Sequence, residues 1–268
     1  MKHEKIKAII KDNLEKIAHL SEQVGSDFNK EIIHDLRVYT KTLRSFLRLL
    51  RFHMYHKELR LSRKFKRMYH ISGAIRDTQL ELEKITACTV ILPEYINKLH
   101  HVLRAQKKEW HRHYDKKVFK KLESKLLSIK YETLHPSVLD NFFGNKFALT
   151  GEIISLKSPS DDQIHLLRKQ IKDMLYISEI IDKKAKGAKK QLKILPVKEL
   201  RQIADIVGSY NDKRVIMAHL DSFSSPDMDK QEIKSIKKMA VKEKANLQKE
   251  RKNILAFVKG LIDHTQRD

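Results

Sequence analysis

The sequence predicts an all-α protein. Only 7 Gly and 5 Pro residues occur among 268, so few positions interrupt regular backbone structure. Charged residues make up 34% of the chain, and apolar residues recur over long stretches with the 3.6-residue period of amphipathic helices. A chain of this length could form one large domain or two small ones, and either would bury a substantial core.

Helix-breaking residues set the expected helices of the first half. We expect four helices there, at 2–22, 27–54, 57–88 and 93–130. Gly25 ends the first, and Gly73 marks a weak point in the third. Pro93 opens the fourth, because proline is favoured at the first helical position.

The second half begins with a loop-rich segment. Residues 131–159 contain most of the loop-forming residues and predict a linker followed by one shorter helix. Three longer helices should follow, each after a Pro, Asp or Ser signal, at 161–185, 196–224 and 228–264. The chain therefore divides into a four-helix half at 1–130 and another at 131–268, which together form one domain.

A basic pattern, HxxRxxxK, occurs once in each half. It places nitrogen-bearing side chains at helical spacing, at His34, Arg37, Lys41, His165, Arg168 and Lys172. No carboxylate stands among these positions, which suits a site that receives an anion. A solvated helix face is also rich in Lys and Arg, but solvation does not require the same register twice.

The first copy continues along the helix expected at 27–54. At about 100° per residue, one face of this helix carries His34, Arg37, Lys41, Arg44, Arg48 and Arg51. The opposite face is apolar, as expected for a helix packed on a core. Between 34 and 51 the only acid is Asp35, which points away from the cations. No i,i+4 carboxylate therefore relieves their mutual repulsion.

A second element is also repeated. The run GAIRD begins at Gly73, the run GSYND begins at Gly208, and a cation precedes each glycine by seven residues, Lys66 and Arg201. We expect the glycines to permit close helix contact. The aspartate that closes each run should cap a following segment or orient a basic neighbour.

Net charge and cysteine content indicate the partner and the compartment. The formal charge of +22 and the pI near 9.8 point to a polyanion or an anionic membrane surface. The single cysteine, Cys88, excludes an internal disulfide and fits a reducing cytosol. No stretch approaches the roughly 18 apolar residues of a membrane span, and the charged N-terminus is unlike a signal peptide. We expect a cytoplasmic protein.

Three segments resemble a known family. IHDLRVYTKTLRSFLRLL is similar to the opening signature of the CHAD domain, a histidine-containing α-helical family, and SGAIRDTQL and VGSYNDKRV resemble its paired glycine elements. The resemblance implies two four-helix bundles related by pseudo-twofold symmetry, with a basic groove or channel between them that binds inorganic polyphosphate. Some relatives associate with polyphosphate granules.

Matching positions carry the family's binding role onto this chain. The resemblance implies polyphosphate contacts for His34, Arg37, Lys41, Arg44, Lys66, Arg76, His165, Arg168, Lys172 and Arg201. The cationic face described above adds Arg48 and Arg51.

The second copy departs from the family pattern. Leu175 stands where the family usually has an arginine, and Glu179 follows on the same line of the helix. Lys169 and Lys198 could supply compensating charge, so both belong to the predicted site. We expect the N-terminal half to provide most of the binding.

The residues favour binding without catalysis. A linear polyphosphate has no base or sugar, so charge, spacing and geometry alone can recognise it. The chain contains no P-loop and no GxSxG nucleophile elbow, and we expect no enzyme, no cofactor and no metal.

Two alternatives remain. His34 and Asp35 form an HD dipeptide of the kind found in metal-dependent phosphohydrolases, but His165 is followed by Leu166, so the repeat keeps the cations and loses the acid. The other alternative is non-specific RNA or DNA binding, which the charge favours and which salt would weaken steeply. Aromatic residues are not interleaved with the cations as in proteins that stack single-stranded bases.

Overall fold

The structure, a computed structural model, describes residues 1–54, 59–87, 92–184, 195–222 and 229–265. Its regular elements are all helices: α1 His3–Asp27, α2 Lys30–Met54, α3 Arg63–Thr86, α4 Pro93–His113, α5 Lys116–Leu127, α6 Pro136–Ser155, α7 Asp161–Lys184, α8 Val197–Ser222 and α9 Lys230–Thr265. The predicted all-α class is confirmed.

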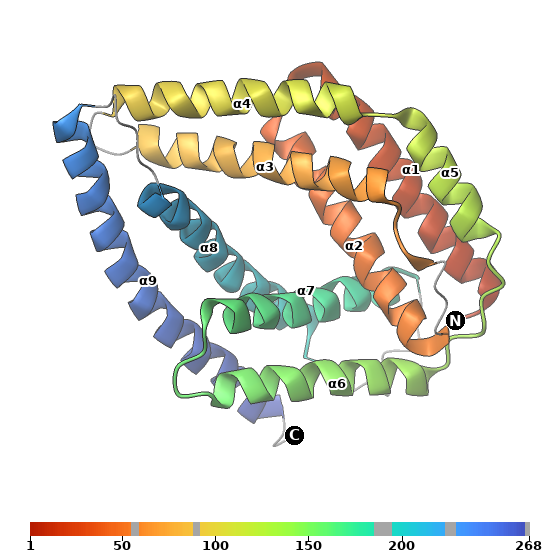
Figure 1. Cartoon of the computed structure of the whole chain (residues 1–268). Coiled ribbons are helices and arrows are strands. Elements are labelled where there is room, and N and C mark those ends of the chain that lie inside the picture. The colour runs from red at the N-terminus through yellow and green to blue at the C-terminus, as the bar shows by residue number, and fades with distance from the viewer. Residues whose placement is uncertain (55–58, 88–91, 185–194, 223–228, 266–268) are drawn as a thin grey trace.

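The helices pack in the same order in the two halves. In the first, α1 packs on α2, α2 on α3 and α3 on α4, while in the second α6 packs on α7, α7 on α8 and α8 on α9. Figure 1 shows α1, α4, α5, α6 and α9 around the outside of the molecule, with α2, α3, α7 and α8 within this frame. The halves meet where α2 packs on α7 and α3 on α8.

The apolar face predicted for the second helix is buried. Leu43 and Leu50 are fully covered, and Phe46 is 1% exposed. These side chains belong to a continuous hydrophobic core that also contains residues of α7 and α8. The cationic positions of α2 consequently lie on its other side.

One predicted helix is wrong. The stretch 93–130 is two helices, because Asp115 accepts a hydrogen bond from the Lys117 backbone N–H at 2.9 Å and starts a new helix. The shorter helix expected within 131–159 is present as the 20 residues of α6, which begin at Pro136. The described part of the first half therefore has five helices, with α5 packed on α1.

Other helix ends shift by a few residues. The first helix runs through Gly25 to Asp27 and ends with Phe28 in the left-handed conformation. The third begins at Arg63, where the Ser62 side chain accepts from the Phe65 backbone N–H. Cys88 lies outside the described residues.

A buried carboxylate joins α2 to α7. Asp173, whose side chain is 3% exposed, accepts hydrogen bonds from Ser45 Oγ at 2.7 Å and from Arg48 Nε at 2.9 Å. Lys146 Nζ of α6 lies 3.0 Å from the same carboxylate. Burial opposes ionisation of Asp173, but these hydrogen bonds and charges outweigh it and lower its pKa.

The helices α4 and α9 cap each other across the two halves. The Glu232 carboxylate of α9 accepts from the Tyr95 backbone N–H at 2.9 Å, at the start of α4. In return the Glu94 carboxylate of α4 accepts from the Asp229 backbone N–H at 3.1 Å, at the start of α9. Carboxylates at helix N-termini satisfy unpaired N–H groups and favour the helix dipole.

Replacing Asp173 by Ala should lower the free energy of unfolding by about 3–5 kcal/mol, because two cations would keep their burial and lose their partner. Chemical denaturation measures the change, and Asp140→Ala, at an exposed position of α6, is the control. Because the pKa of Asp173 is lowered, its carboxylate stabilises the fold fully at pH values above the ordinary carboxyl pKa. This stabilisation is lost as the pH falls through the folded-state pKa. The difference in free energy of unfolding between wild type and Asp173→Ala should therefore become smaller at acidic pH. Equal stability of Asp173→Ala and Asp140→Ala at neutral pH would contradict this role.

Candidate anion-binding clefts

A cleft of about 750 Å³ lies between α2, α3, α7 and α8. We call it the central cleft. Five of the predicted site residues line it: His34, Lys41, Arg168, Lys172 and Arg201. They come from both halves of the chain, so the packing of α2 on α7 brings two residues of each copy of the basic pattern to one place.

Lys41 is the most perturbed cation of the central cleft. Burial, and then the charges of Arg37, Arg168 and Lys172, lower the pKa of its amine to about 7, while Asp212 opposes the shift. The pKa of Lys172 is also lowered, by burial and by Arg168. Cations of the two halves therefore repel one another around Lys41, and a bound anion would relieve that repulsion.

The two pattern histidines differ in position. His34 lines the central cleft, and burial followed by Arg76 and Lys41 lowers its pKa. His165 does not line it, and its pKa is lowered by burial against an opposing hydrogen bond with Asn211. A nearby polyanion would raise both pKa values, because it stabilises the imidazolium form.

Arg37 is directed toward α3 and does not line the central cleft. Its Nη1 donates to the Tyr69 carbonyl oxygen at 3.2 Å, and its guanidinium lies 4.9 Å from the Tyr69 ring centroid. A Cβ on Gly73 would come within 2.4 Å of that Nη1. Gly73 therefore leaves room for the Arg37 guanidinium. The sequence predicted that this glycine permits close helix contact, and the group that approaches it closely is this side chain.

The predicted row of six cations on α2 is interrupted. Arg44 covers the same Tyr69 ring at 5.0 Å, and Arg48 is ion-paired with Asp173. Beyond them lies a second hollow of about 340 Å³, which we call the distal hollow, lined by Arg44, Leu47, Arg48, Arg51, Leu59, Arg60, Leu61 and Lys66. The row is therefore divided between two places.

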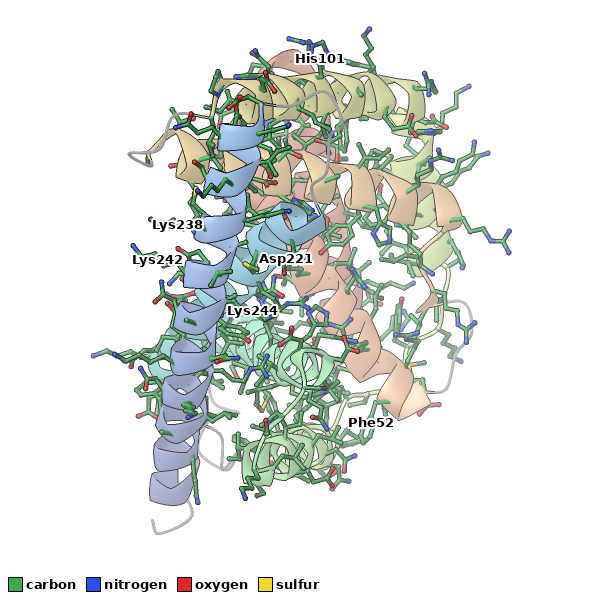
Figure 2. The ribbon with its side chains drawn as sticks, turned by 60° about the vertical axis from the view of Figure 1, so that its left-hand side comes forward. Phe52, His101, Asp221, Lys238, Lys242 and Lys244 are labelled. Carbon is green, nitrogen blue, oxygen red and sulfur yellow. The ribbon has the colours of Figure 1, made fainter. Side chains whose placement is uncertain are left out.

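Besides Arg37 and His165, three predicted residues line neither cleft among the described residues. Arg76 is half-buried on α3, close enough to His34 to lower its pKa, and its Nη1 has no hydrogen-bond partner among the described residues. Lys169 and Lys198 are exposed on α7 and α8. Another basic stripe runs along α4, where Figure 2 shows His101 at the edge of the molecule, and consists of His100, Arg104, Lys107, Lys108 and His111.

The profile of the CHAD domain matches residues 8–221. The chain belongs to the CHAD domain family. Its structure is similar to the crystal structure of the CHAD domain from the plant Ricinus communis, with a TM-score of 0.72 and 16% sequence identity over 97% of this chain and 91% of that one. At this identity the likeness shows the fold. A comparison with curated proteins gave no match.

Three further cations line the central cleft of this CHAD domain, Lys30, Lys84 and Lys213. Lys30 precedes His34 by one helical turn, and Lys213 directly follows the repeated GSYND run. The sequence shows these lysines beside the repeated elements. It does not show that their side chains face the cleft, because that depends on how α3 and α8 pack.

Carboxylates also line the central cleft, and most are paired. Glu83 lies 2.5 Å from Lys30 Nζ, and Glu179 lies 2.5 Å from an Arg201 nitrogen. Asp205 lies 3.8 Å from Lys172 Nζ. The departure seen in the sequence thus has a physical effect, since Glu179 neutralises a predicted binding residue.

The aspartates of the two repeated runs lie near the same charges. Burial raises the pKa of Asp77, Arg37 opposes this, and Asp212 adds to it. Asp212 also raises the pKa values of Lys41 and Lys172. Asp77 lies inside α3 and Asp212 inside α8, so the expectation that they cap a following segment is wrong, and both lie close to basic side chains.

Within the described residues, no three His, Cys, Asp or Glu side chains gather in a way that could hold a metal ion. His34 and Asp35 line different hollows. His34 lines the central cleft, and Asp35 lines another hollow together with Asp12 and Lys16. None of the described helices combines the length and the apolar character that crossing a membrane requires.

Stability should rise with pH as Lys41 loses its proton. Its folded-state pKa of about 7 lies below the ordinary lysine value of 10.5, so between these values the unfolded chain holds more protons than the folded one. The free energy of unfolding should therefore increase from pH 7 upward, and Lys41→Met should be more stable than wild type below pH 7. Denaturation across this pH range measures both effects.

Lys120→Met, at an exposed position of α5, is the matched control and should keep the wild-type dependence. Lys172 contributes to the remaining rise, because its pKa is also lowered. An identical pH dependence in Lys41→Met and wild type would show that Lys41 is not buried among cations.

Proposed function

We propose that this CHAD domain binds inorganic polyphosphate in the central cleft and does not catalyse a reaction on it. The observation that carries the proposal is the convergence of Lys41, Arg168 and Lys172 from two helices of opposite halves, close enough to depress the pKa of Lys41. Such a cluster of like charges is unfavourable until an anion occupies it. Polyphosphate is the anion that the family resemblance implies.

The donors of the cleft suit phosphate oxygens. Arg168 presents a guanidinium whose Nε is buried and has no hydrogen-bond partner within the described part of the chain. An unsatisfied buried donor is costly, and a phosphate oxygen would accept from it. Lysines add compact ammonium charges, and arginines add planar forks that match two phosphate oxygens at once.

The carboxylates of the cleft do not prevent anion binding. The Asp205 side chain is 70% exposed, and Arg201, the partner of Glu179, is 60% exposed. Their partners are less exposed, Lys172 at 19% and Glu179 at 23%, but each pair keeps one side chain open to solvent, so a phosphate can compete with the carboxylate for the cation. The second half therefore contributes to the cleft despite Leu175, which is buried in its wall.

Nucleic acid fits the central cleft less well. The aromatic residue lining it is Tyr176, which is 4% exposed and presents little ring surface for a base. Tyr69, beside the cleft, is covered by Arg37 and Arg44. Non-specific affinity for RNA or DNA would come from the remaining surface charge, such as the exposed Lys238 and Lys242 that project from α9 in Figure 2.

An HD-type phosphohydrolase is the weaker alternative. His34 faces the central cleft and Asp35 a different hollow, so the dipeptide does not present both side chains to one ligand. A polyphosphate-binding protein of this family would act in the cytoplasm, with polyphosphate granules as one place of action.

Replacing Arg168 and Lys172 together by Gln should weaken binding of long-chain polyphosphate about 100-fold, because two charge-assisted contacts of ~1.5 kcal/mol each are lost. Calorimetry at about 150 mM salt measures the change. Arg104→Gln with Lys108→Gln removes the same charge from an exposed face of α4 and should leave the affinity near wild type. If both double variants lost the same amount of polyphosphate affinity, the loss would reflect net charge and not the central cleft.

Competition and turnover address the two alternatives. RNA or DNA of equal charge should displace polyphosphate poorly, and displacement as effective as that by polyphosphate itself would refute the ligand assignment. Incubation with polyphosphate and a divalent metal should release no phosphate. Release that His34→Ala abolishes would establish the phosphohydrolase instead.

A further inference from the structure

The distal hollow contains a concentration of positive charge that the central cleft does not have. Five cations line its 340 Å³, Arg44, Arg48, Arg51, Arg60 and Lys66, and no carboxylate lines it among the described residues. The central cleft is about twice as large and includes four carboxylates in its lining, Glu83, Glu179, Asp205 and Asp212. The smaller hollow is thus the more uniformly cationic one.

The cations of the distal hollow converge on Arg51. Burial lowers the pKa of Arg51, and Arg48, Arg60 and Arg44 lower it further, in that order. The Nε of Arg51 is buried and has no hydrogen-bond partner among the described residues. A half-buried guanidinium with an unused donor, facing three other guanidinium groups, is an arrangement that an anion would stabilise.

The hollow is also held in shape before any ligand binds. Asp173 fixes Arg48 through its Nε, as described above. Opposite it, Leu59 is 1% exposed, and the Lys125 amine donates to the Arg60 carbonyl oxygen at 3.3 Å, which anchors the segment that enters α3. Preorganised donors lose less conformational freedom on binding.

The two clefts are separate. They share no lining residue among those described. Lys41 and Arg51 stand 10 positions apart on α2, about 15 Å along the helix at ~1.5 Å per residue. Between them lie Tyr69, covered by Arg37 and Arg44, and the pair of Arg48 with Asp173.

We infer that the distal hollow is a second anion site, which takes a compact oligophosphate such as inorganic tripolyphosphate or the end of a longer chain. Terminal phosphates carry an additional ionisable oxygen, so a short oligophosphate or a chain end has more negative charge per unit than the interior of a chain. A small hollow lined by five cations, and by no carboxylate among the described residues, matches this high density of negative charge. Binding of a free oligophosphate here does not depend on the central cleft. Only binding of the end of a longer polyphosphate chain rests on the proposed function.

Calorimetric titration with inorganic tripolyphosphate tests the site. Arg51→Gln with Arg60→Gln should remove one binding event or weaken it about tenfold or more. Arg168→Gln with Lys172→Gln should leave that event in place, and the exposed pair Arg104→Gln with Lys108→Gln should change neither. Unchanged tripolyphosphate binding in the Arg51 and Arg60 variant would overturn the inference, whatever happens at the central cleft.

Two further measurements complete the test. Arg51→Lys with Arg60→Lys keeps the charge and the packing of the side-chain stems, and should still weaken tripolyphosphate because the guanidinium forks are lost. It also serves if the Gln variant fails to fold. Binding by this variant equal to wild type would contradict a guanidinium site.

Prior saturation with long-chain polyphosphate separates the two sources of the ligand. If one chain reaches both clefts, it will block tripolyphosphate from the distal hollow, and Arg51→Gln with Arg60→Gln will weaken the long chain too. If the hollow takes free oligophosphate, tripolyphosphate will still bind there. Either result supports a second site and identifies its occupant.

Discussion

The buried contact of Asp173 with Arg48, Ser45 and Lys146 is the interaction on which both clefts depend. Packing α2 on α7 brings two cation-rich helices together, which like-charge repulsion opposes. Asp173 supplies an opposite charge at the point of contact, where its burial makes the Coulomb attraction strong and its hydrogen bonds satisfy it. The same pairing fixes Arg48 in the wall of the distal hollow, while His34 and Lys41 of the same helix line the central cleft.

The clefts limit their repulsion in different ways. In the central cleft, carboxylates pair with Lys30, Arg201 and Lys172, and Lys41 can lose its proton near neutral pH. Arginine has no such option, because it stays protonated at any physiological pH. Apart from Arg48, which pairs with Asp173, the arginines of the distal hollow therefore keep their charge, and no carboxylate among the described lining residues offsets it. Sites built for binding are often strained in this way, at some expense of stability.

Much of the fold could be predicted from the sequence, because the pattern that determines helices is formed by residues close together in the chain. The period of apolar residues fixes helices and their buried faces, so the helix of Leu43 and Phe46 has the predicted orientation. The break at Asp115 was missed because one capping hydrogen bond decides it, within a stretch of continuous helical character. The direction of long cationic side chains could not be predicted, since their partners come from distant parts of the chain. Arg48 and Asp173 are 125 residues apart. Gly73 and Gly208 also match in sequence, but Gly73 accommodates Arg37 and Gly208 lines the central cleft.

The expectation that the first half provides most of the binding stays a prediction. In the central cleft the two halves contribute equally, with Arg168, Lys172, Arg201 and Lys213 from the second and Lys30, His34, Lys41 and Lys84 from the first. The first half places most of its arginines around the distal hollow instead. A phosphate in the central cleft would restore the proton of Lys41, because an adjacent anion raises a lysine pKa. Ligand binding there is consequently coupled to proton uptake, whereas the arginine-lined distal hollow would bind its ligand without it. If both clefts bind anions, the two should therefore differ in how their affinity responds to pH.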